Sequence, residues 1–365
     1  MGYNTFMKSI SFLLPAISNS PCGGYKVVYE YANYLANRGY DVSIIYPCYH
    51  GPQKRLSELI KTIYRVIKYN FTQPFRQQWF PLNPNIREHI VPSLHQMFVP
   101  KADVYIATAI QTSYYLKNYS FTNTKRFYLI QDFEAWYGIP DEEVYKTYGF
   151  GLCNIAISDW LTEKVRQCGH ACHTVKNGFD FNRFKLENPI EHRSPYTVSM
   201  LYHVQERKGC KYGIKALERV KQAYPQLNAI FFGIPPRPDF LPNWIRYYQQ
   251  PDAEMHNRLL NESAIFLAPS IMEGWGLTVG EAMICGNAIV CSEAEGFKEM
   301  VSNGKEGLIV PVKNADALAK GLITLIKNPS LRISMANNAL QRIKSFTWDN
   351  SFKQFEDILS DSSSN

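Results

Sequence analysis

Residues 268–283 read APSIMEGWGLTVGEAM. An apolar run at 265–268 predicts a buried strand, and the pattern from Leu277 onward predicts a helix. Between them lies a loop with one acid and two glycines. Glycines let a ligand approach the backbone closely, and the unpaired N–H groups in the first turn of a helix attract phosphate. The stretch therefore predicts a phosphate site at the end of a strand.

Two carboxylates flank this loop. Glu273 precedes the predicted helix and Glu281 lies about one turn inside it, so the two can contact different parts of one extended ligand. The alternative is a pair of solvent-exposed acids. Trp275, between two glycines, either plugs the loop or bounds a ligand pocket. Both pairs of alternatives stay open at this point.

Predicted strands and helices alternate on both sides of this loop. In the first half, strands are expected at 9–14, 41–46, 103–108, 126–131 and 153–158, with a helix at 25–37. In the second half, we expect strands at 196–201, 229–232, 265–268 and 288–291, with helices at 209–223, 254–261 and 277–285. Strands that alternate with helices indicate doubly wound parallel sheets. The polar stretch 185–195, with two prolines, predicts a domain boundary.

Composition agrees with two folded domains. The chain has 365 residues, of which 45% are hydrophobic and 19% charged, and this excludes a disordered protein. Its net charge of +7 suits phosphates or an anionic membrane surface and is too small to indicate nucleic acid. No run approaches the ~18 apolar residues of a membrane-spanning helix, and no signal-peptide cleavage site follows the apolar run at 10–14, so we expect a cytoplasmic protein.

The cysteines predict no disulfide framework and no metal site. The chain has eight, scattered through apolar or loop contexts, and we expect buried thiols. Residues 168–173, CGHACH, hold four zinc-ligand side chains, but no second Cys/His pair is evident, so a loop is the preferred interpretation. The sequence also lacks the signatures of P-loop ATPases, α/β-hydrolases and zinc proteases.

Residues 55–80 interrupt the alternation. Ile60, Ile63, Tyr64, Ile67 and Phe71 are spaced as one face of a helix. The preferred interpretation is an amphipathic helix packed on the sheet. The alternative is an element that contacts a membrane surface or an acceptor, because the opposite face carries Lys61, Arg65 and Lys68.

Several motifs together resemble glycosyltransferase family 4. They are Gly23-Gly24, Lys176-Asn177-Gly178 with Asp180 and Phe184, Lys208-Gly209, the stretch 268–283, and the stretches 296–301 and 304–310. The resemblance covers nearly the whole chain. It implies the GT-B fold, in which two Rossmann-like doubly wound parallel-sheet domains face each other and a C-terminal helix crosses back. We expect an acceptor-side domain at 1–188, a donor-binding domain at 189–345, and the returning helix with a polar tail at 346–365.

The resemblance implies retaining transfer of a sugar from a nucleoside diphosphate sugar to a hydroxyl of a glycan or lipid-linked glycan, in cell-surface polysaccharide synthesis. By position, Glu273 and Lys208 resemble the catalytic residues: Glu273 holds the donor sugar and stabilises the reaction centre, and Lys208 neutralises the leaving phosphate. The residues that the resemblance assigns to donor binding are Gly23, Gly24, His203, Arg207, Gly274, Trp275, Gly276, Leu277, Thr278 and Glu281. No metal or other cofactor is required in principle, and no nucleic-acid partner is expected.

Two positions depart from the family pattern. His203 stands five residues before Lys208, where the family commonly has arginine, so only a part-time positive charge is expected there near neutral pH. Either Arg207 then takes the place of the arginine, or the diphosphate is held with less charge. Gln131 stands where many members place a histidine near the acceptor, with Asp132 and Glu134 as neighbouring acids. The run 131–134, QDFE, resembles members that act on rhamnose-containing polysaccharides.

Two other functions remain as alternatives. One is a sugar-nucleotide epimerase of the same fold, which would release no acceptor product. The other is a non-catalytic module that binds carbohydrate or nucleotide, against which the presence of Glu273, Glu281 and Lys208 argues.

Overall fold

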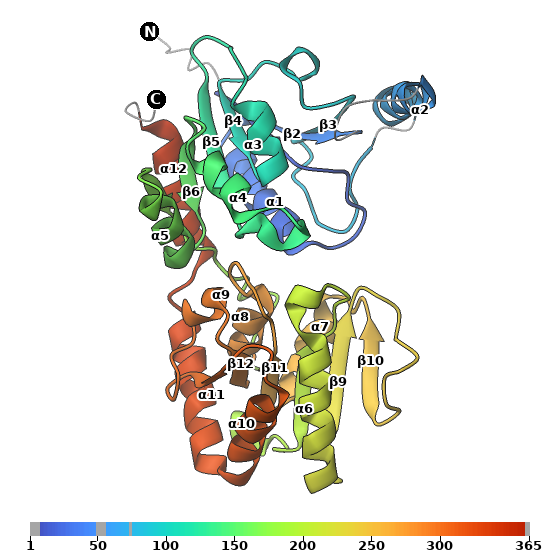
Figure 1. Cartoon of the computed structure of the whole chain (residues 1–365), viewed down its shortest axis with the longest axis vertical. Coiled ribbons are helices and arrows are strands. Elements are labelled where there is room, and N and C mark those ends of the chain that lie inside the picture. Colours follow the sequence, from blue (N-terminus) through green and yellow to red (C-terminus); the bar gives the residue numbers. More distant parts are fainter. Residues whose placement is uncertain (1–7, 49–55, 73–74, 362–365) are drawn as a thin grey trace. The chain divides into compact units, whose positions relative to one another are not determined.

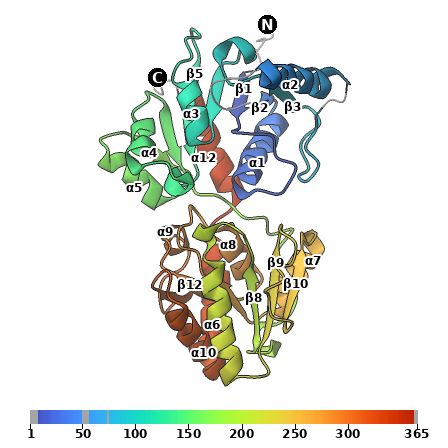
Figure 2. The same ribbon diagram turned by 45° about the vertical axis from the view of Figure 1, so that its right-hand side comes forward.

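The computed structural model describes residues 8–48, 56–72 and 75–361 (Figure 1). The chain forms two compact units, which we call unit 1, Met1–Lys176 with Ser351–Asn365, and unit 2, Asn177–Asn350. Each unit is built on its own parallel sheet with helices on the sheet faces (Figures 1 and 2). The predicted α/β architecture of two Rossmann-like domains is confirmed.

The described residues of unit 1 form a seven-stranded parallel sheet in the order β3-β2-β1-β4-β5-β6-β7. Its strands are β1 Ser9–Leu13, β2 Asp41–Pro47, β3 Arg87–Val91, β4 Val104–Ala107, β5 Lys125–Ile130, β6 Cys153–Ala156 and β7 Cys172–Thr174. The helices are α1 Gly23–Asn37, α2 Leu56–Ile67, α3 Ile110–Leu116, α4 Asp141–Tyr148, α5 Asp159–Gln167 and, from the end of the chain, α12 Trp348–Ser360. The strand order reverses between β1 and β4, where α/β sheets bind ligands beyond the carboxyl ends of the strands.

The described residues of unit 2 form a six-stranded parallel sheet in the order β10-β9-β8-β11-β12-β13. Its strands are β8 Thr197–Leu201, β9 Asn228–Gly233, β10 Ile245–Gln249, β11 Ile265–Ala268, β12 Ala288–Ser292 and β13 Gly307–Val310. The helices are α6 Cys210–Ala223, α7 Ala253–Glu262, α8 Leu277–Ile284, α9 Glu295–Lys298, α10 Ala315–Lys327 and α11 Pro329–Ile343. Every residue of β11 and β12 is buried, as expected of strands covered by helices on both faces.

The last helix, α12, joins the core of unit 1. Phe355 is fully buried and stacks on Tyr31 of α1, with ring centroids 4.1 Å apart. Glu356 accepts hydrogen bonds from the hydroxyl groups of Tyr34, at 2.6 Å, and Tyr40, at 3.1 Å. Figures 1 and 2 both show α12 against the helices and strands of unit 1. The predicted return of the C-terminal helix is confirmed.

The unit boundaries differ from the predicted domain boundaries at 188/189 and 345/346. The chain passes into unit 2 after Lys176 and leaves it after Asn350. The reason is that residues after Lys176 already bind unit 2: Lys185 N–H donates to Asn257 Oδ1 at 3.0 Å, and Glu187 N–H donates to Asn261 Oδ1 at 2.7 Å. The linker pattern at 185–195 therefore marks a polar surface segment of unit 2.

Helix α2 does not pack its apolar face on the sheet, and the preferred interpretation of residues 55–80 is wrong in this respect. The side chains of that face are 50–80% exposed at Ile60, Ile63, Tyr64, Ile67 and Phe71. On the other side of the helix, the Thr62 side chain is buried, at 4% exposure. A π-helical turn, Lys68–Thr72, follows α2. The apolar face of α2 is thus an exposed apolar surface of unit 1.

Candidate functional site

The loop between β11 and α8 carries Glu273. Helix α8 begins at Leu277 after Gly276, whose φ of +97° is a left-handed conformation that favours glycine. A Cβ at Gly276 would also lie 2.8 Å from the ring of Phe297. The glycine of the sequence motif is therefore needed to turn the chain into the helix.

The same loop is fastened to the connection between β12 and α9. Gly296 N–H donates to the carbonyl oxygen of Glu273 at 3.0 Å, and a Cβ at Gly296 would lie 2.5 Å from that oxygen. Ser292 Oγ donates to the carbonyl oxygen of Ser270. Gly296 and Ser292 thus hold the backbone of the Glu273 loop in place.

Lys208 reaches Glu273 because two turns of unit 2 approach each other closely. Gly209, with φ of +62°, lies so near Pro269 that a Cβ would be 1.9 Å from the Pro269 carbonyl oxygen. Lys208 Nζ donates to Glu273 Oε1 at 2.8 Å and to Oε2 at 2.6 Å. The two side chains are only 15% and 14% exposed. The two residues predicted to be catalytic therefore form a largely buried ion pair.

The surroundings of Glu273 favour its ionised form. Burial acts to raise the pKa of Glu273, but the charges of Lys208 and Arg207 outweigh burial and hold the pKa below its ordinary value. Ser270 Oγ also donates to Glu273 Oε2 at 3.2 Å. These contacts hold the Glu273 carboxylate in one orientation. A cavity of about 10 Å³ beside the pair is lined by Lys208, Ser270, Glu273 and Thr278 among others, a volume near that of one water molecule.

His203 is neutral in this environment. Burial, followed by the charges of Lys208 and Arg207, lowers its pKa from 6.5 to about 4. Its Nδ1 accepts a hydrogen bond from Gln205 N–H at 3.0 Å, so the neutral ring carries its proton on Nε2. The expectation of a histidine charge in place of the family arginine is therefore wrong, because the neighbouring cations and burial both disfavour imidazolium.

Arg207 supplies the second positive charge near Glu273. Its Nε donates to Gln205 Oε1 at 3.0 Å, and its carbonyl oxygen accepts from Ile271 N–H at 2.7 Å. This second contact joins the turn that carries Lys208 to the loop that carries Glu273. Whether Arg207 takes the place of the family arginine or the diphosphate is held with less charge stays a prediction.

The remaining unit 2 residues of the predicted site lie on or next to α8. Glu281 is 7% exposed and lies one turn into the helix. The Trp275 ring is 2% exposed; it stacks on Phe179, with centroids 6.5 Å apart, and meets Phe346 edge-on at 5.5 Å. The Trp275 side chain therefore plugs the loop and does not bound an open pocket. Gly274, Leu277 and Thr278 surround the start of the helix.

A second group of predicted residues lies in unit 1, at the start of α1 and the carboxyl end of β5. Gly23 and Gly24 open α1, and a Cβ on Gly24 would lie 3.5 Å from Gln131 Oε1. Gln131 Nε2 donates to the Thr108 carbonyl oxygen at 3.4 Å, while its buried Oε1 has no hydrogen-bond partner among the described residues. The structure thus brings Gln131 against the glycines of α1.

The two acids beside Gln131 have structural contacts. Glu134 is 8% exposed, and its Oε2 accepts from Ile110 N–H at 3.0 Å, at the first residue of α3. Asp132 Oδ1 accepts from Phe133 N–H at 2.9 Å. Glu134 therefore holds the start of a helix, and neither acid is arranged as an evident base.

Sequence reasoning missed Ser270, Gln205 and Ser292, which orient the residues it found. Ser270 bonds Glu273, Gln205 bonds both His203 and Arg207, and Ser292 fastens the Glu273 loop. The one available signal was position: Ser270 lies three residues before Glu273 and Gln205 two after His203. Short polar residues at such spacings are common in turns, so the signal is weak.

The described part of the chain contains no group of three or more His, Cys, Asp or Glu side chains that could hold a metal ion. The eight cysteines are free thiols, but the expectation that they are buried is correct for only four of them, Cys172, Cys210, Cys285 and Cys291. His170 of the 168–173 run packs against Gly149, where a Cβ would lie 2.8 Å from its Nε2. Among the described helices, none has the length and apolar character needed to cross a membrane.

Comparison with known proteins agrees with this geometry. Residues 182–342 match a family model described as glycosyl transferases group 1. The chain is 24% identical over 370 residues to phosphatidyl-myo-inositol mannosyltransferase of Mycolicibacterium smegmatis, covering 93% of this chain and 90% of that protein.

Two solved structures share the fold. Sucrose-phosphate synthase from Thermosynechococcus elongatus has a TM-score of 0.75 at 14% identity and covers 96% of this chain and 98% of its own. HepE of Anabaena in complex with UDP has a TM-score of 0.74 at 18% identity and covers 97% of this chain and 100% of its own. The chain is therefore a glycosyltransferase with the GT-B fold, and its residues 182–342 are similar to the glycosyl transferases of group 1.

Proposed function

We propose that the enzyme transfers a sugar, with retention of configuration, from a nucleoside diphosphate sugar to a hydroxyl of a glycan or lipid-linked glycan. Support comes from the Anabaena neighbour, which binds UDP, and from the mycobacterial relative, whose name gives a phosphatidyl-myo-inositol acceptor. We place the reaction in cell-surface polysaccharide synthesis, with a rhamnose-related substrate as its narrower form, at the cytoplasmic face of a membrane.

The observation that carries the proposal is the Lys208–Glu273 pair beside the start of α8. In the reaction, the bond from the anomeric carbon to the diphosphate oxygen breaks, and its electron pair stays on that oxygen. An ammonium has three donors, so Lys208 can bond both Glu273 oxygens and still offer one N–H to the departing phosphate. Ionised Glu273 stabilises the oxocarbenium-like sugar by its charge.

The acceptor hydroxyl then attacks the anomeric carbon from the face that the diphosphate leaves. Its proton passes to the leaving phosphate oxygen, so the step needs no protein base. This agrees with Gln131, an amide that cannot take a proton at neutral pH, at the acceptor side of unit 1.

Donor binding in unit 2 uses the residues around this centre. The backbone of residues 274–278 lies at the start of α8, where N–H groups and the helix dipole favour the diphosphate. In unit 1, Gly23 and Gly24 open α1, whose first N–H groups have the same preference for an anion. Glu281 accepts hydrogen bonds from the ribose. Neutral His203 contributes an Nε2–H donor, and Arg207 contributes the charge.

Thermal unfolding with a panel of nucleotides tests donor binding. One of UDP, GDP, dTDP or ADP, with its sugars, should raise the melting temperature by mass action. The Glu273→Gln variant should retain this shift but lose about 10²–10³ in sugar transfer, because its charge acts mainly in the transition state. Glu206→Gln, in the same turn as Lys208 but exposed, is the matched control and should transfer at the wild-type rate.

Product analysis separates the alternatives. An epimerase would convert the donor sugar and form no glycosylated acceptor, and a non-catalytic module would bind the nucleotide without consuming it. Either result would overturn the proposal.

The proposed transfer uses Lys208, Arg207 and backbone N–H groups, and no metal ion, to balance the diphosphate charge. Addition of EDTA to a running assay should therefore leave the transfer rate unchanged. A loss that added Mg²⁺ or Mn²⁺ restores would contradict this part of the proposal.

We also propose that the apolar face of α2 contacts the surface of an anionic membrane. Its exposed side chains, among them Ile63 and Ile67, lie on the same helix as the exposed cations Lys61 and Arg65. An amphipathic helix that carries cations as well as an apolar face is suited to lie in the headgroup layer.

Flotation with lipid vesicles tests this contact. The protein should float with vesicles that contain phosphatidylglycerol and bind less to phosphatidylcholine alone. Changing Ile63 and Ile67 to serine should abolish flotation, whereas Met97→Ser, at an 81% exposed side chain elsewhere in unit 1, should not. Equal flotation of both variants would rule out α2 as the contact.

A further inference from the structure

The buried amide of Asn177 lies where the chain first enters unit 2. Asn177 is the first residue of that unit, and its side chain is only 1% exposed. Neither its Nδ2 nor its Oδ1 has a hydrogen-bond partner among the described residues. A buried polar group without a partner costs stability, because folding removes the water that would otherwise bind it. The Asn177 amide therefore destabilises the arrangement of the chain described above.

Asn177 differs in this respect from the other buried amides of the described residues, which are bonded at one end or at both. Asn154, Asn287 and Gln131 each lack a partner at the side-chain oxygen but donate from the nitrogen. Asn261 is bonded at both ends: its Oδ1 accepts from a backbone N–H at 2.7 Å, and its Nδ2 donates to a carbonyl oxygen at 2.9 Å. The exception at Asn177 needs a reason other than packing, because an apolar side chain would pack there without this cost.

The backbone around Asn177 is fixed to the segment by which the chain returns to unit 1. The carbonyl oxygen of Lys176 accepts from Ser351 Oγ, and Phe179 N–H donates to the carbonyl oxygen of Phe346 at 3.1 Å. The chain passes between the units at these two segments, which we call the crossovers. Any change in the arrangement of the units must therefore alter backbone torsion angles at the crossovers.

Phe179 connects the first crossover to the loop and helix that carry Glu273. Its ring stacks on Trp275, with centroids 6.5 Å apart, and a Cβ at Gly280 would lie 2.1 Å from it. Trp275 follows Glu273 by two residues, and Gly280 lies in the first turn of α8. A ligand that moves this loop or helix must displace Phe179, and Phe179 is only two residues from Asn177.

We propose that Asn177 is a positioning residue for the donor: its amide gains hydrogen-bond partners in a second arrangement of the crossovers, which nucleotide binding at α8 selects. A ligand shifts a protein between two arrangements by the difference in its affinity for them. Bonds that Asn177 makes only in the second arrangement stabilise that arrangement, and they therefore raise the affinity for the nucleotide. The inference rests on the proposed binding of a nucleoside diphosphate sugar. It gives a role to the motif 176–178, which the proposed chemistry does not use.

Asn177→Leu tests this role, because leucine cannot form the hydrogen bonds. The melting temperature of the protein alone should rise by at least about 2 °C, since an unpaired polar group is removed. The affinity for whichever of UDP, GDP, dTDP and ADP the wild type binds should fall at least about fivefold in calorimetric titration, the equivalent of one hydrogen bond of typical net strength. A purely structural hydrogen bond would not give these opposite changes, because its loss lowers the melting temperature.

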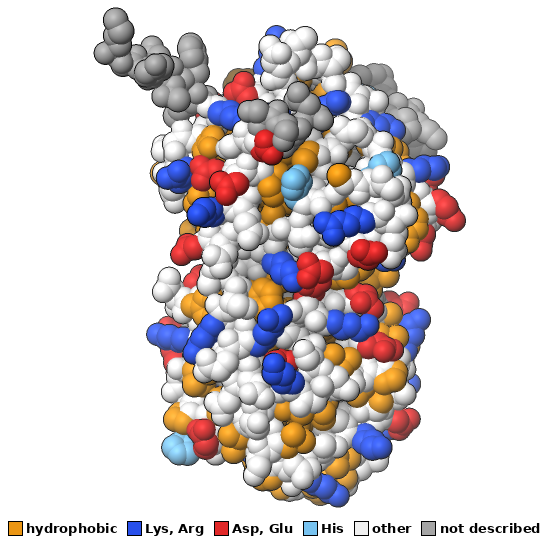
Figure 3. All heavy atoms as spheres, turned by 90° about the vertical axis from the view of Figure 1, so that its left-hand side faces the viewer, with side chains coloured by type: hydrophobic (Ala, Val, Ile, Leu, Met, Phe, Trp, Pro, Cys, Tyr) orange, Lys and Arg blue, Asp and Glu red, His pale blue; other side chains and the backbone are white. Residues whose placement is uncertain are grey.

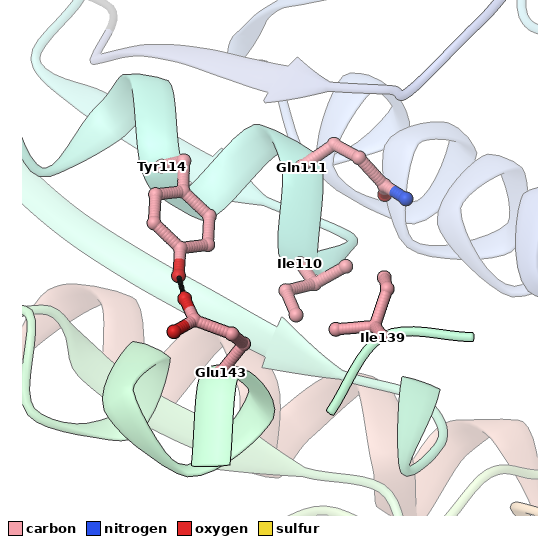
Figure 4. A pocket seen from close by; sticks show the side chains of 5 residues that line it. All are labelled: Ile110, Gln111, Tyr114, Ile139 and Glu143. Atoms are coloured by element: carbon pink, nitrogen blue, oxygen red, sulfur yellow. Dashed lines mark hydrogen bonds between the residues drawn. The ribbon is translucent and has the colours of Figure 1, made fainter. Parts of the chain in front are cut away.

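Three further variants serve as controls. Asn177→Ala is measured beside Asn177→Leu because leucine is larger than asparagine, and it should melt no lower than the wild type. Asn261→Leu should melt at a lower temperature, because it removes an amide that is bonded at both ends. Tyr114→Phe removes the hydrogen bond to Glu143 Oε2, at 2.6 Å, whose two side chains meet in Figure 4. This change in unit 1 should leave the nucleotide affinity at the wild-type value.

A fall in the melting temperature of both Asn177 variants would show that the amide is bonded in the arrangement described above, and it would overturn the inference. Unchanged nucleotide affinity in both variants would overturn it as well, because the amide would then gain no partner on binding. The route through Phe179 is tested in a Phe179→Leu background, where Asn177→Leu should change the affinity less than twofold. The same fivefold loss in that background would overturn the route.

The same titrations separate this inference from the proposed function. If the wild type binds one of the four nucleotides and transfers sugar, but Asn177→Leu and Asn177→Ala bind it equally tightly, the inference alone is wrong. If the wild type binds none of the four nucleotides, the proposed transfer is wrong, and the inference falls with it.

Discussion

Single residues decide the chemistry of unit 2, and Lys208 and Glu273 depend on each other most. Their ion pair, at 2.6 and 2.8 Å and about 85% buried, is stable because each charge satisfies the other. Lys208→Ala should lower the free energy of unfolding by about 3 kcal/mol, the lower end of the cost of leaving one buried charge unpaired. Urea unfolding measures this loss.

The exposed pair Lys211–Glu206 is the matched comparison, with side chains 55% and 75% exposed. Lys211→Ala should cost less than about 1 kcal/mol, as for other surface ion pairs. If Lys208→Ala lowers the free energy of unfolding by no more than Lys211→Ala does, the Lys208–Glu273 pair does not stabilise the fold more than a surface ion pair.

His203 gives a pH prediction at the same scale. Its pKa of about 4 in the folded protein lies below its ordinary value of 6.5, so the unfolded chain binds the proton more readily. The stability that neutral His203 contributes is complete above about pH 6.5 and is lost as the pH falls toward about 4. His203→Gln should remove this part of the pH dependence in urea unfolding between those two values. Parallel profiles for the two proteins would contradict it.

The affinity for the nucleotide gives a second pH test. Because His203 stays neutral above about pH 6, calorimetric titration at about pH 8 and about pH 6 should give no rise in nucleotide affinity that depends on His203. A rise on acidification that His203→Gln abolishes would show that the ring is charged when the nucleotide binds.

At the scale of elements, a glycine in α1 and a glycine in α8 differ in the space available for a side chain. A Cβ on Gly280 of α8 would lie 2.1 Å from the Phe179 ring, whereas one on Gly24 of α1 would make ordinary contact with Gln131 at 3.5 Å. Gly280→Ala should therefore destabilise the protein by about 1–3 kcal/mol through overpacking. Gly24→Ala should keep or raise the stability, by up to about 1 kcal/mol through helix propensity.

At Gly24, we expect the effect on nucleotide binding to differ from the effect on stability. If the diphosphate approaches the backbone there, the added methyl group should weaken nucleotide binding although the fold is intact. Thermal unfolding of the two variants measures their stability, and calorimetric titration measures their affinity for the nucleotide. Unchanged nucleotide affinity in Gly24→Ala would remove α1 from the donor site.

The central strands could be predicted from the sequence, whereas the edge strands β3 and β10 could not. Strands such as β11 are buried throughout and read as short apolar runs. The edge strand β3 buries only Ile90 and Val91, and the edge strand β10 only Ile245, so their sequences lack a strand pattern. Helix α2 has a regular apolar stripe, but periodicity alone does not say whether a neighbour covers it.

Some residues of the candidate site could also be predicted from the sequence, and others could not. Glu273 and Lys208 lie in motifs with family-specific spacing, whereas Ser270 and Gln205 act through turns that only the folded chain brings together. The neutral state of His203 follows from burial and from cations that lie nearby in space, which no local pattern contains.

At the scale of the whole molecule, charge and connectivity matter most. On the face shown in Figure 3, Lys and Arg side chains intermix with Asp and Glu, and neither sign forms a continuous patch. This face therefore presents interspersed charges of both signs.

The return of the chain to unit 1 predicts a large effect of a residue near the C-terminus. Phe355, fully buried, contacts Tyr31 and Phe12, with ring centroids 4.1 and 6.5 Å away. Phe355→Ala should lower the free energy of unfolding by about 3–5 kcal/mol, because it leaves a cavity in the core. Phe240→Ala, at a 68% exposed ring, should change it by less than about 0.5 kcal/mol. Similar effects of both changes in urea unfolding would contradict the role given to α12.

This connectivity also sets the order in which the protein can fold during synthesis. Unit 2 is one continuous segment, Asn177–Asn350, and its core can close as soon as that segment has left the ribosome. Unit 1 needs both Met1–Lys176 and Ser351–Asn365, so its core stays incomplete until the second of these segments has been synthesised. Domains usually fold from the N-terminus onward; here the second unit can complete its core before the first.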